Sequence, residues 1–295
     1  MDKLIAIVGT NASGKSSLGV ELALRFNAEI VSADSRQVYR GMDLGSGKIT
    51  PAGMRGVPHH LLDVCEPGDF FSMADFQRLA YAAIDDILAR GRVPMLVGGT
   101  GLYVDSVTQG YELSDTAPDL AYRDELEKRS TAELYQMLLD LVPDADVDPA
   151  NRNRVMRRLE KLHDGDCAQP SARPRHETLK IGVSWDRETL KKRIDERLDR
   201  RTAQGMSDEV RTLRARGASD EFLLKLGLEY RYITEYLTGR WPTEDEMLHE
   251  LSLAIKRFAK RQMTWFKRDK SIHWLDMAGD PISEASALIE AFLQK

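Results

Sequence analysis

The strongest chemical signal in the sequence is a phosphate-binding loop near the N-terminus. Its residues fit the pattern Gly-x-x-x-x-Gly-Lys-Ser, between an apolar segment typical of a strand and an amphipathic segment typical of a helix. In that context successive backbone N–H groups and the helix N-terminus face a phosphate. Lys15 adds a positive charge, and the Ser16 hydroxyl can ligate Mg²⁺. The sequence therefore predicts a cradle for a diphosphate, made of Gly9, Thr10, Asn11, Ala12, Ser13, Gly14, Lys15 and Ser16.

A carboxylate and a glycine-rich turn follow two further apolar segments. Asp34 ends the segment 29–33, and ligands of open α/β sheets bind at that edge. Its position alone allows two roles, an outer ligand of Mg²⁺ as in many P-loop NTPases or a general base that faces a substrate. The segment 93–97 ends in two glycines before Thr100, where a P-loop NTPase often has an acid. These glycines either let a substrate approach the backbone or form a tight turn without a ligand.

Two basic helical segments lie in the second half of the chain. Arg193 and Arg197 are four residues apart and share a helix face, which is either solvated or supplies an arginine clamp for phosphates. The segment 256–266 combines basic residues one turn apart with Trp265 and Phe266. It suits phosphate tracking and base stacking, unless the aromatic residues belong to the core.

These residues require a parallel sheet to bring them together. Strand patterns at 3–9, 29–33, 93–97, 178–185 and 272–275 alternate with helical patterns, which predicts the α/β class. We expect a P-loop NTPase-like parallel sheet flanked by helices, with a helical insertion domain. Residues 1–110 and 176–295 would form the core with its C-terminal helices, and residues 111–175 the insertion. After residue 186 the pattern predicts one long helix to 217, a shorter one to 239, and another from 243 to about 267.

Composition limits the class of protein. The 295 residues carry a net charge of −5, which argues mildly against nucleic-acid binding. The charge is uneven, however: residues 149–161 have five bases and one acid, and residues 256–270 have seven bases and one acid. Two cysteines, Cys65 and Cys167, exclude a disulfide framework, and no apolar run approaches the roughly 20 residues that span a membrane. We expect a cytoplasmic monomer that has no membrane partner.

Five segments together resemble one known family, the bacterial tRNA dimethylallyltransferases, also called tRNA isopentenyltransferases or IPP transferases. The resemblance extends from about residue 3 to residue 276, and the first two segments are together highly specific. It implies transfer of a dimethylallyl group from dimethylallyl diphosphate to N6 of the adenosine 3′ of the tRNA anticodon, with Mg²⁺ bound to Ser16. The segments are 9–16, 34–43, 58–63, 98–103 and 260–265.

The resemblance also implies roles for individual residues. Asp34 is similar to the family's general base, Thr100 to the residue that hydrogen-bonds at the reacting centre, and Arg197 to the arginine that binds the leaving diphosphate. The insertion would contact the anticodon stem-loop. The tRNA-binding positions implied are Asp34, Ser35, Arg36, Gln37, Thr100, Arg123, Arg154 and Arg157.

The sequence departs from the family pattern at three places. Thr10-Asn11 replaces the usual Pro-Thr, the segment 226–231 is two residues longer than the usual Ile-Gly-Tyr, and the insertion is short. The P-loop pattern is also typical of nucleotide-binding, ATP-using proteins. Three alternatives are therefore a small-molecule kinase, an adenylate prenyltransferase that uses free nucleotides, and a nucleotide-dependent RNA-binding module. The missing acid after 93–97 and the basic helices disfavour the kinase. The adenylate enzyme would not need the arginines at 152–158 or the insertion, and a binding module without chemistry has no use for the carboxylate of Asp34.

Overall fold

The computed structural model describes residues 1–113, 119–165 and 172–294. Cys167 lies outside these ranges. The chain forms two compact units, one of residues 1–111 with 173–295 and the other of residues 112–172. The sequence analysis placed this boundary at 110/111 and 175/176.

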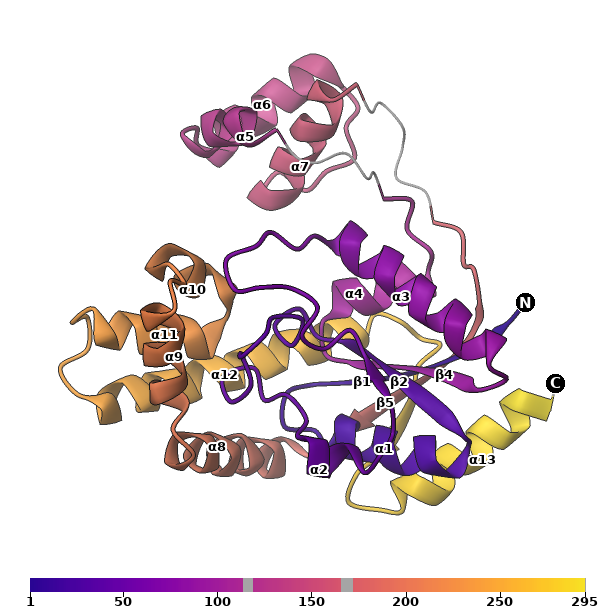
Figure 1. The fold of residues 1–295 in the computed structure, drawn as a ribbon. Helices are drawn as coiled ribbons and strands as arrows, with labels where there is room; N and C mark the ends of the chain where they lie inside the picture. Colours follow the sequence, from indigo (N-terminus) through magenta and orange to yellow (C-terminus); the bar gives the residue numbers. More distant parts are fainter. Residues whose placement is uncertain (114–118, 166–171, 295) are drawn as a thin grey trace. The chain divides into compact units, whose positions relative to one another are not determined.

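The first unit contains a six-stranded sheet in which every pairing is parallel (Figure 1). Its strand order is β3-β2-β4-β1-β5-β6, so the P-loop strand β1 is central, between β4 and β5. The five strands expected from the sequence are confirmed, whereas the two-residue strand β3 was missed. The strands are β1 (Lys3–Gly9), β2 (Ala28–Ala33), β3 (His59–His60), β4 (Val93–Gly98), β5 (Glu177–Ser184) and β6 (His273–Asp276).

Alternate residues of β1 supply the two faces of the sheet, as the period of two in a strand requires. Ile5 and Ile7 pack in one core cluster with α1 (Lys15–Arg25) and α13 (Pro281–Gln294). Leu4, Ala6 and Val8 pack in another with α3 (Met73–Ala89) and α4 (Gly101–Thr108). The helices therefore cover both faces and leave the carboxyl ends of the strands for a site (Figure 1).

A helical lobe completes the first unit around a third core cluster. The long helix expected up to residue 217 is in fact two helices, because Gly205 adopts a left-handed conformation with φ 94°. The helix expected up to 239 is also divided, at Gly227. The helices of the lobe are α8 (Arg187–Ala203), α9 (Met206–Ala215), α10 (Asp220–Leu226), α11 (Leu228–Leu237) and α12 (Glu244–Phe266); a short helix α2 (Pro51–Met54) follows β2.

The second unit has three helices in its described residues, α5 (Leu120–Glu127), α6 (Thr131–Leu141) and α7 (Arg152–His163). They enclose a small apolar cluster of their own that includes Leu126, Leu134 and Leu159. Within the described ranges of the whole chain, every helix is too short or too polar to cross a membrane.

Candidate active site

The loop between β1 and α1 is held in place by residues distant in sequence. Asn11 N–H donates to Gln262 Oε1 of α12 at 2.9 Å, and Trp185 Nε1–H donates to the Ser13 carbonyl at 3.0 Å. Arg193 Nε–H donates to the Ala12 carbonyl at 3.0 Å. Arg193 therefore braces the loop backbone through Nε, and its role as a phosphate clamp stays a prediction.

A small pocket of about 40 Å³ lies beside this loop. Six residues that the sequence singled out line it together: Asn11, Lys15 and Ser16 of the P-loop, Asp34 and Gln37 after β2, and Arg197 of α8. The remaining lining residues are Ile30, Ser32, Ser46, Gly47, Ile49, His59, Val97 and Gly98.

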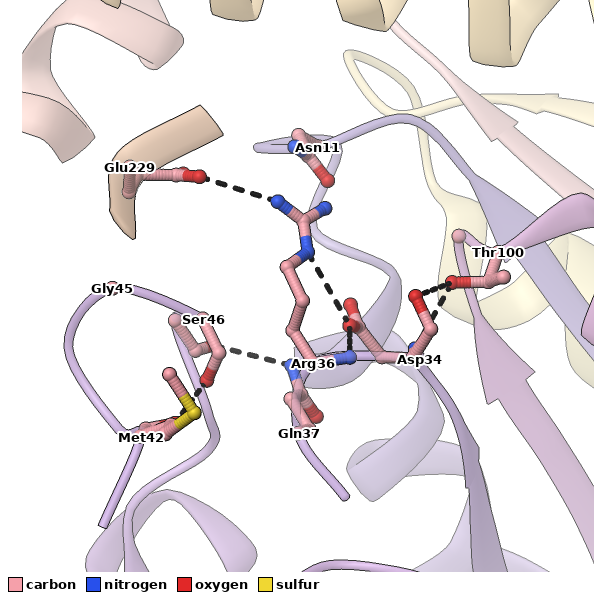
Figure 2. A network of polar contacts seen from close by, with 12 residues as sticks. Asn11, Asp34, Arg36, Gln37, Met42, Gly45, Ser46, Thr100 and Glu229 are labelled. Atoms are coloured by element: carbon pink, nitrogen blue, oxygen red, sulfur yellow. Dashed lines mark hydrogen bonds and ion pairs between the residues drawn. The ribbon is translucent and has the colours of Figure 1, made fainter. Parts of the chain in front are cut away.

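A buried ion network joins Asp34 to the helical lobe (Figure 2). Arg36 N–H donates to Asp34 Oδ1 at 3.0 Å, and the Arg36 guanidinium lies 3.9 Å from the same oxygen. Glu229 of α11 is 3% exposed and pairs with both Arg36 and Arg201 at 3.2 Å. Sequence reasoning did not single out Glu229. The only signal was that it lies in the segment 226–231, which departs from the family pattern.

Positive charge exceeds negative charge around the pocket. Four cationic side chains, Lys15, Arg36, Arg197 and Arg201, interact with the carboxylates of Asp34 and Glu229. Burial lowers the pKa of Lys15 to about 8, against the attraction of Asp34. Burial and then repulsion by Arg201 lower the pKa of Arg197 to about 10. A multivalent anion would relieve this repulsion.

Thr100 and Ser35 connect the ends of β4 and β2. Thr100 Oγ1 accepts a hydrogen bond from Ser35 N–H at 3.1 Å and lies 3.5 Å from Ser35 Oγ (Figure 2). Gln262 donates to the Gly99 carbonyl at 2.9 Å, so it ties this turn to the P-loop. Asp34 and Thr100, expected to act together, therefore belong to one hydrogen-bonded corner.

A larger and more apolar pocket of about 450 Å³ adjoins the same corner. Phe266 is only 3% exposed and belongs to the core, which bears out the structural alternative for that residue. Of the basic side chains in the segment 256–266, Arg261 lines this pocket. Lys256 instead pairs with Asp195 at 2.7 Å. The lining residues are Ser35, Arg36, Gly99, Thr100, Gly101, Leu102, Leu224, Lys225, Leu226, Gly227, Leu228, Arg231, Phe258, Arg261, Gln262, Trp265 and Phe266.

The second unit brings together two of the three arginines that the resemblance assigned to RNA binding. Arg123 of α5 and Arg157 of α7 both lie beside the buried Glu160, at 3.6 Å and 3.1 Å. Arg154, on α7, is exposed. All three belong to this unit, whereas the other implied site residues belong to the first.

His59 and His60 form strand β3, and His60 Nε2 lies 2.7 Å from Glu29. This contact with β2 gives His60 a structural role. Within the described ranges, no three His, Cys, Asp or Glu side chains gather as a metal site.

The Gly-x-x-x-x-Gly-Lys-Ser loop at the carboxyl edge of a parallel sheet flanked by helices places the chain in the α/β class. Comparison with known proteins narrows the class. The family model described as IPP transferase matches residues 37–269, and the model described as isopentenyl transferase matches residues 2–67. The chain belongs to the IPP transferase family.

Similar proteins span nearly the same length. A protein of Trichlorobacter lovleyi named tRNA dimethylallyltransferase 2 is 43% identical over 98% of this chain and 97% of its own. One of Geobacillus thermodenitrificans named tRNA dimethylallyltransferase is 40% identical over 99% and 95%. The crystal structure of a tRNA isopentenylpyrophosphate transferase from Bacillus halodurans has a TM-score of 0.78 at 39% identity, covering 100% of this chain and 97% of that one.

Proposed function

We propose that the protein transfers a dimethylallyl group from dimethylallyl diphosphate to N6 of the adenosine 3′ of the anticodon in tRNA and releases diphosphate. One observation carries the proposal beyond the relatives' names. The segment that contains Asp34, Ser35 and Arg36 borders two pockets of opposite character. The small one, beside the P-loop, is rich in cations, and the larger one is mainly apolar. A diphosphate in the first and a nucleoside in the second would meet at Asp34 and Thr100.

The reaction needs a base and a stabilised leaving group. An adenine amine is a weak nucleophile, because its lone pair is delocalised into the ring. As N6 attacks C1 of the dimethylallyl chain, Asp34 would accept the N6 proton while the bond from C1 to the diphosphate oxygen breaks. Oδ1 of Asp34 already accepts a hydrogen bond from Arg36 N–H, so Oδ2 would accept the proton. Thr100 would orient the adenosine at this corner.

The leaving diphosphate gains negative charge as the bond breaks. P-loop N–H groups, Lys15 and Arg197 would stabilise that charge, since all border the same pocket. Ser16 in this pocket would hold Mg²⁺ through its hydroxyl, as the Ser or Thr that follows the P-loop lysine does beside substrate phosphates. When bound, Mg²⁺ would neutralise part of the diphosphate charge.

Arginines of the second unit would bind the tRNA backbone. Arg123 and Arg157 present guanidinium groups on either side of Glu160, and exposed Arg154 lies on the same helix as Arg157. This unit favours a tRNA substrate over free adenine nucleotides, which do not need it. A kinase is disfavoured, because the end of β4 has Gly98 and Gly99 where a hydrolytic P-loop protein often has an acid.

Prenyl transfer can be tested with unmodified tRNA, Mg²⁺ and labelled dimethylallyl diphosphate. We expect label on the adenosine 3′ of the anticodon. In Asp34→Asn the turnover should fall about 10²-fold or more with tRNA affinity nearly unchanged. Asp86→Asn, on exposed α3 surface, is the matched control. Normal turnover of the Asp34 variant would remove this residue from the role of base, and absence of label with wild-type protein would refute the function.

A further inference from the structure

A loop after β2 forms one wall of the pocket beside the P-loop. Residues 43–47, here the 43–47 loop, place Ser46 and Gly47 in the pocket lining. The Gly47 carbonyl accepts a hydrogen bond from Arg197 Nη2 at 3.1 Å, and the Gly45 carbonyl accepts one from Arg201. The backbone of this loop therefore anchors two arginines of α8.

A carboxylate of the helical lobe holds this loop. Glu209 of α9 accepts hydrogen bonds from three successive backbone N–H groups, those of Asp43 at 2.9 Å, Leu44 at 2.7 Å and Gly45 at 2.9 Å. The Tyr230 hydroxyl donates to the same carboxylate at 3.0 Å. Three consecutive N–H groups directed at one anion form a nest, the backbone arrangement that binds carboxylates and phosphates.

The loop packs too closely to tolerate displacement. A Cβ on Gly45 would overlap the Tyr230 ring, and a Cβ on Gly47 would overlap the Arg197 guanidinium. Gly47 also has a φ of +64°, a left-handed conformation that few other residues adopt. A shift of the loop would therefore move the guanidinium that rests on it.

We infer that Glu209 is a positioning residue for diphosphate binding, acting through the 43–47 loop on Arg197. The inference rests on the proposed function for the identity of the anion. Glu209 does not line the pocket beside the P-loop, and its effect passes through the Gly47 carbonyl. A merely structural brace would change the stability of the whole protein, whereas a positioning residue changes the affinity for one substrate.

The isosteric variant Glu209→Gln tests this directly. A carboxamide has one acceptor oxygen, so its NH₂ group must face either two loop N–H donors or the Gly45 N–H. Inorganic diphosphate with Mg²⁺, titrated by calorimetry, should bind about tenfold more weakly to this variant. That factor is expected when a displaced Arg197 loses one charge-assisted hydrogen bond to the diphosphate. The KM for dimethylallyl diphosphate should rise by a similar factor, with kcat and the KM for tRNA changed much less.

Two controls separate the loop from its surroundings. Asp208→Asn removes one charge from the neighbouring, exposed position of α9, where Asp208 pairs with Arg211. Tyr230→Phe removes the other donor to Glu209 but leaves the loop N–H bonds intact. Both should bind diphosphate within about twofold of wild type, since neither changes the nest.

Each outcome is decisive. Unchanged diphosphate affinity in Glu209→Gln overturns the inference. Equal weakening of diphosphate binding and tRNA binding, together with a lowered melting temperature, also overturns it, because that result is expected of a structural brace. Should Glu209→Gln fail to fold, Glu209→Asp takes its place, and failure of both to fold makes Glu209 structural. If wild type binds diphosphate but transfers no prenyl group, the proposed function fails, while the binding comparison still decides the role of Glu209.

Discussion

Replacing Lys15 by methionine should stabilise the protein while it abolishes diphosphate binding. The Lys15 side chain donates to the Thr10 carbonyl at 3.1 Å and shares its surroundings with Arg197 and Arg36. Its pKa is lowered from 10.5 to about 8, primarily by burial. The protonated side chain is therefore unfavourable in the folded protein, because the anion that would neutralise it belongs to the substrate.

The pKa gives the sign and the size of the effect. Between pH 8 and 10.5 folded Lys15 binds fewer protons than unfolded Lys15, so the free energy of unfolding of wild type increases with pH across this window. This contribution of Lys15 is lost again as the pH falls through 8. The shift corresponds to about 3 kcal/mol at pH 7. Loss of the hydrogen bond to Thr10 offsets about 1 kcal/mol in Lys15→Met. The variant should therefore be about 2 kcal/mol more stable at pH 7.

Urea unfolding at several pH values between 7 and 10.5 measures this difference. The free energy of unfolding of wild type should rise with pH relative to that of Lys15→Met, and the two should converge near pH 10. Lys192→Met, at an exposed position of α8, should change neither the stability at pH 7 nor the pH slope. A less stable Lys15→Met protein with the wild-type pH slope would refute the idea that protonated Lys15 is unfavourable in the folded protein.

Two further predictions concern the turn after β4 and the second unit. Gly98→Ala should destabilise the protein by about 2 kcal/mol or more, because its Cβ would overlap the backbone of Ala33 on β2. Urea unfolding measures this loss, and a free energy of unfolding equal to that of wild type would contradict the packing argument. Arg154→Ala and Arg157→Ala should each weaken tRNA binding, as measured by filter binding. Each should also reduce the slope of log affinity against log salt concentration by about 1. An unchanged slope in both variants would argue against phosphate contacts.

The sequence was most informative where chemistry requires a local pattern. The P-loop and the strands were evident because eight consecutive residues, or a run of apolar residues, encode them. The helix breaks at Gly205 and Gly227 were missed because isolated glycines are tolerated within helical patterns. Strand β3 has two residues, too few to show a period.

Contacts between elements that are far apart in the sequence could not be predicted from it. Glu229 and Glu209 carry no motif, and each has a partner more than 160 residues away, Arg36 for Glu229 and the 43–47 loop for Glu209. The glycines at 98, 99 and 101 also have contacts that the sequence did not predict. A Cβ would overlap Ala33 at Gly98, Gln262 at Gly99 and the Trp265 indole at Gly101. Gly99 and Gly101 line the larger pocket as well, so the approach of a substrate to this backbone stays a prediction.

The excess of cations has a consequence for rate as well as for binding. Dimethylallyl diphosphate gains negative charge on its diphosphate only as the bond to C1 breaks. Half-buried cations such as Lys15 and Arg197 would therefore stabilise the transition state more than the bound substrate, which is the condition for raising kcat. The charge of Lys15, which burial disfavours in the folded protein, becomes favourable at that step. On this argument the reduced stability of the free protein and the stabilised transition state have one physical cause, a set of cations arranged before the charge that they bind has formed.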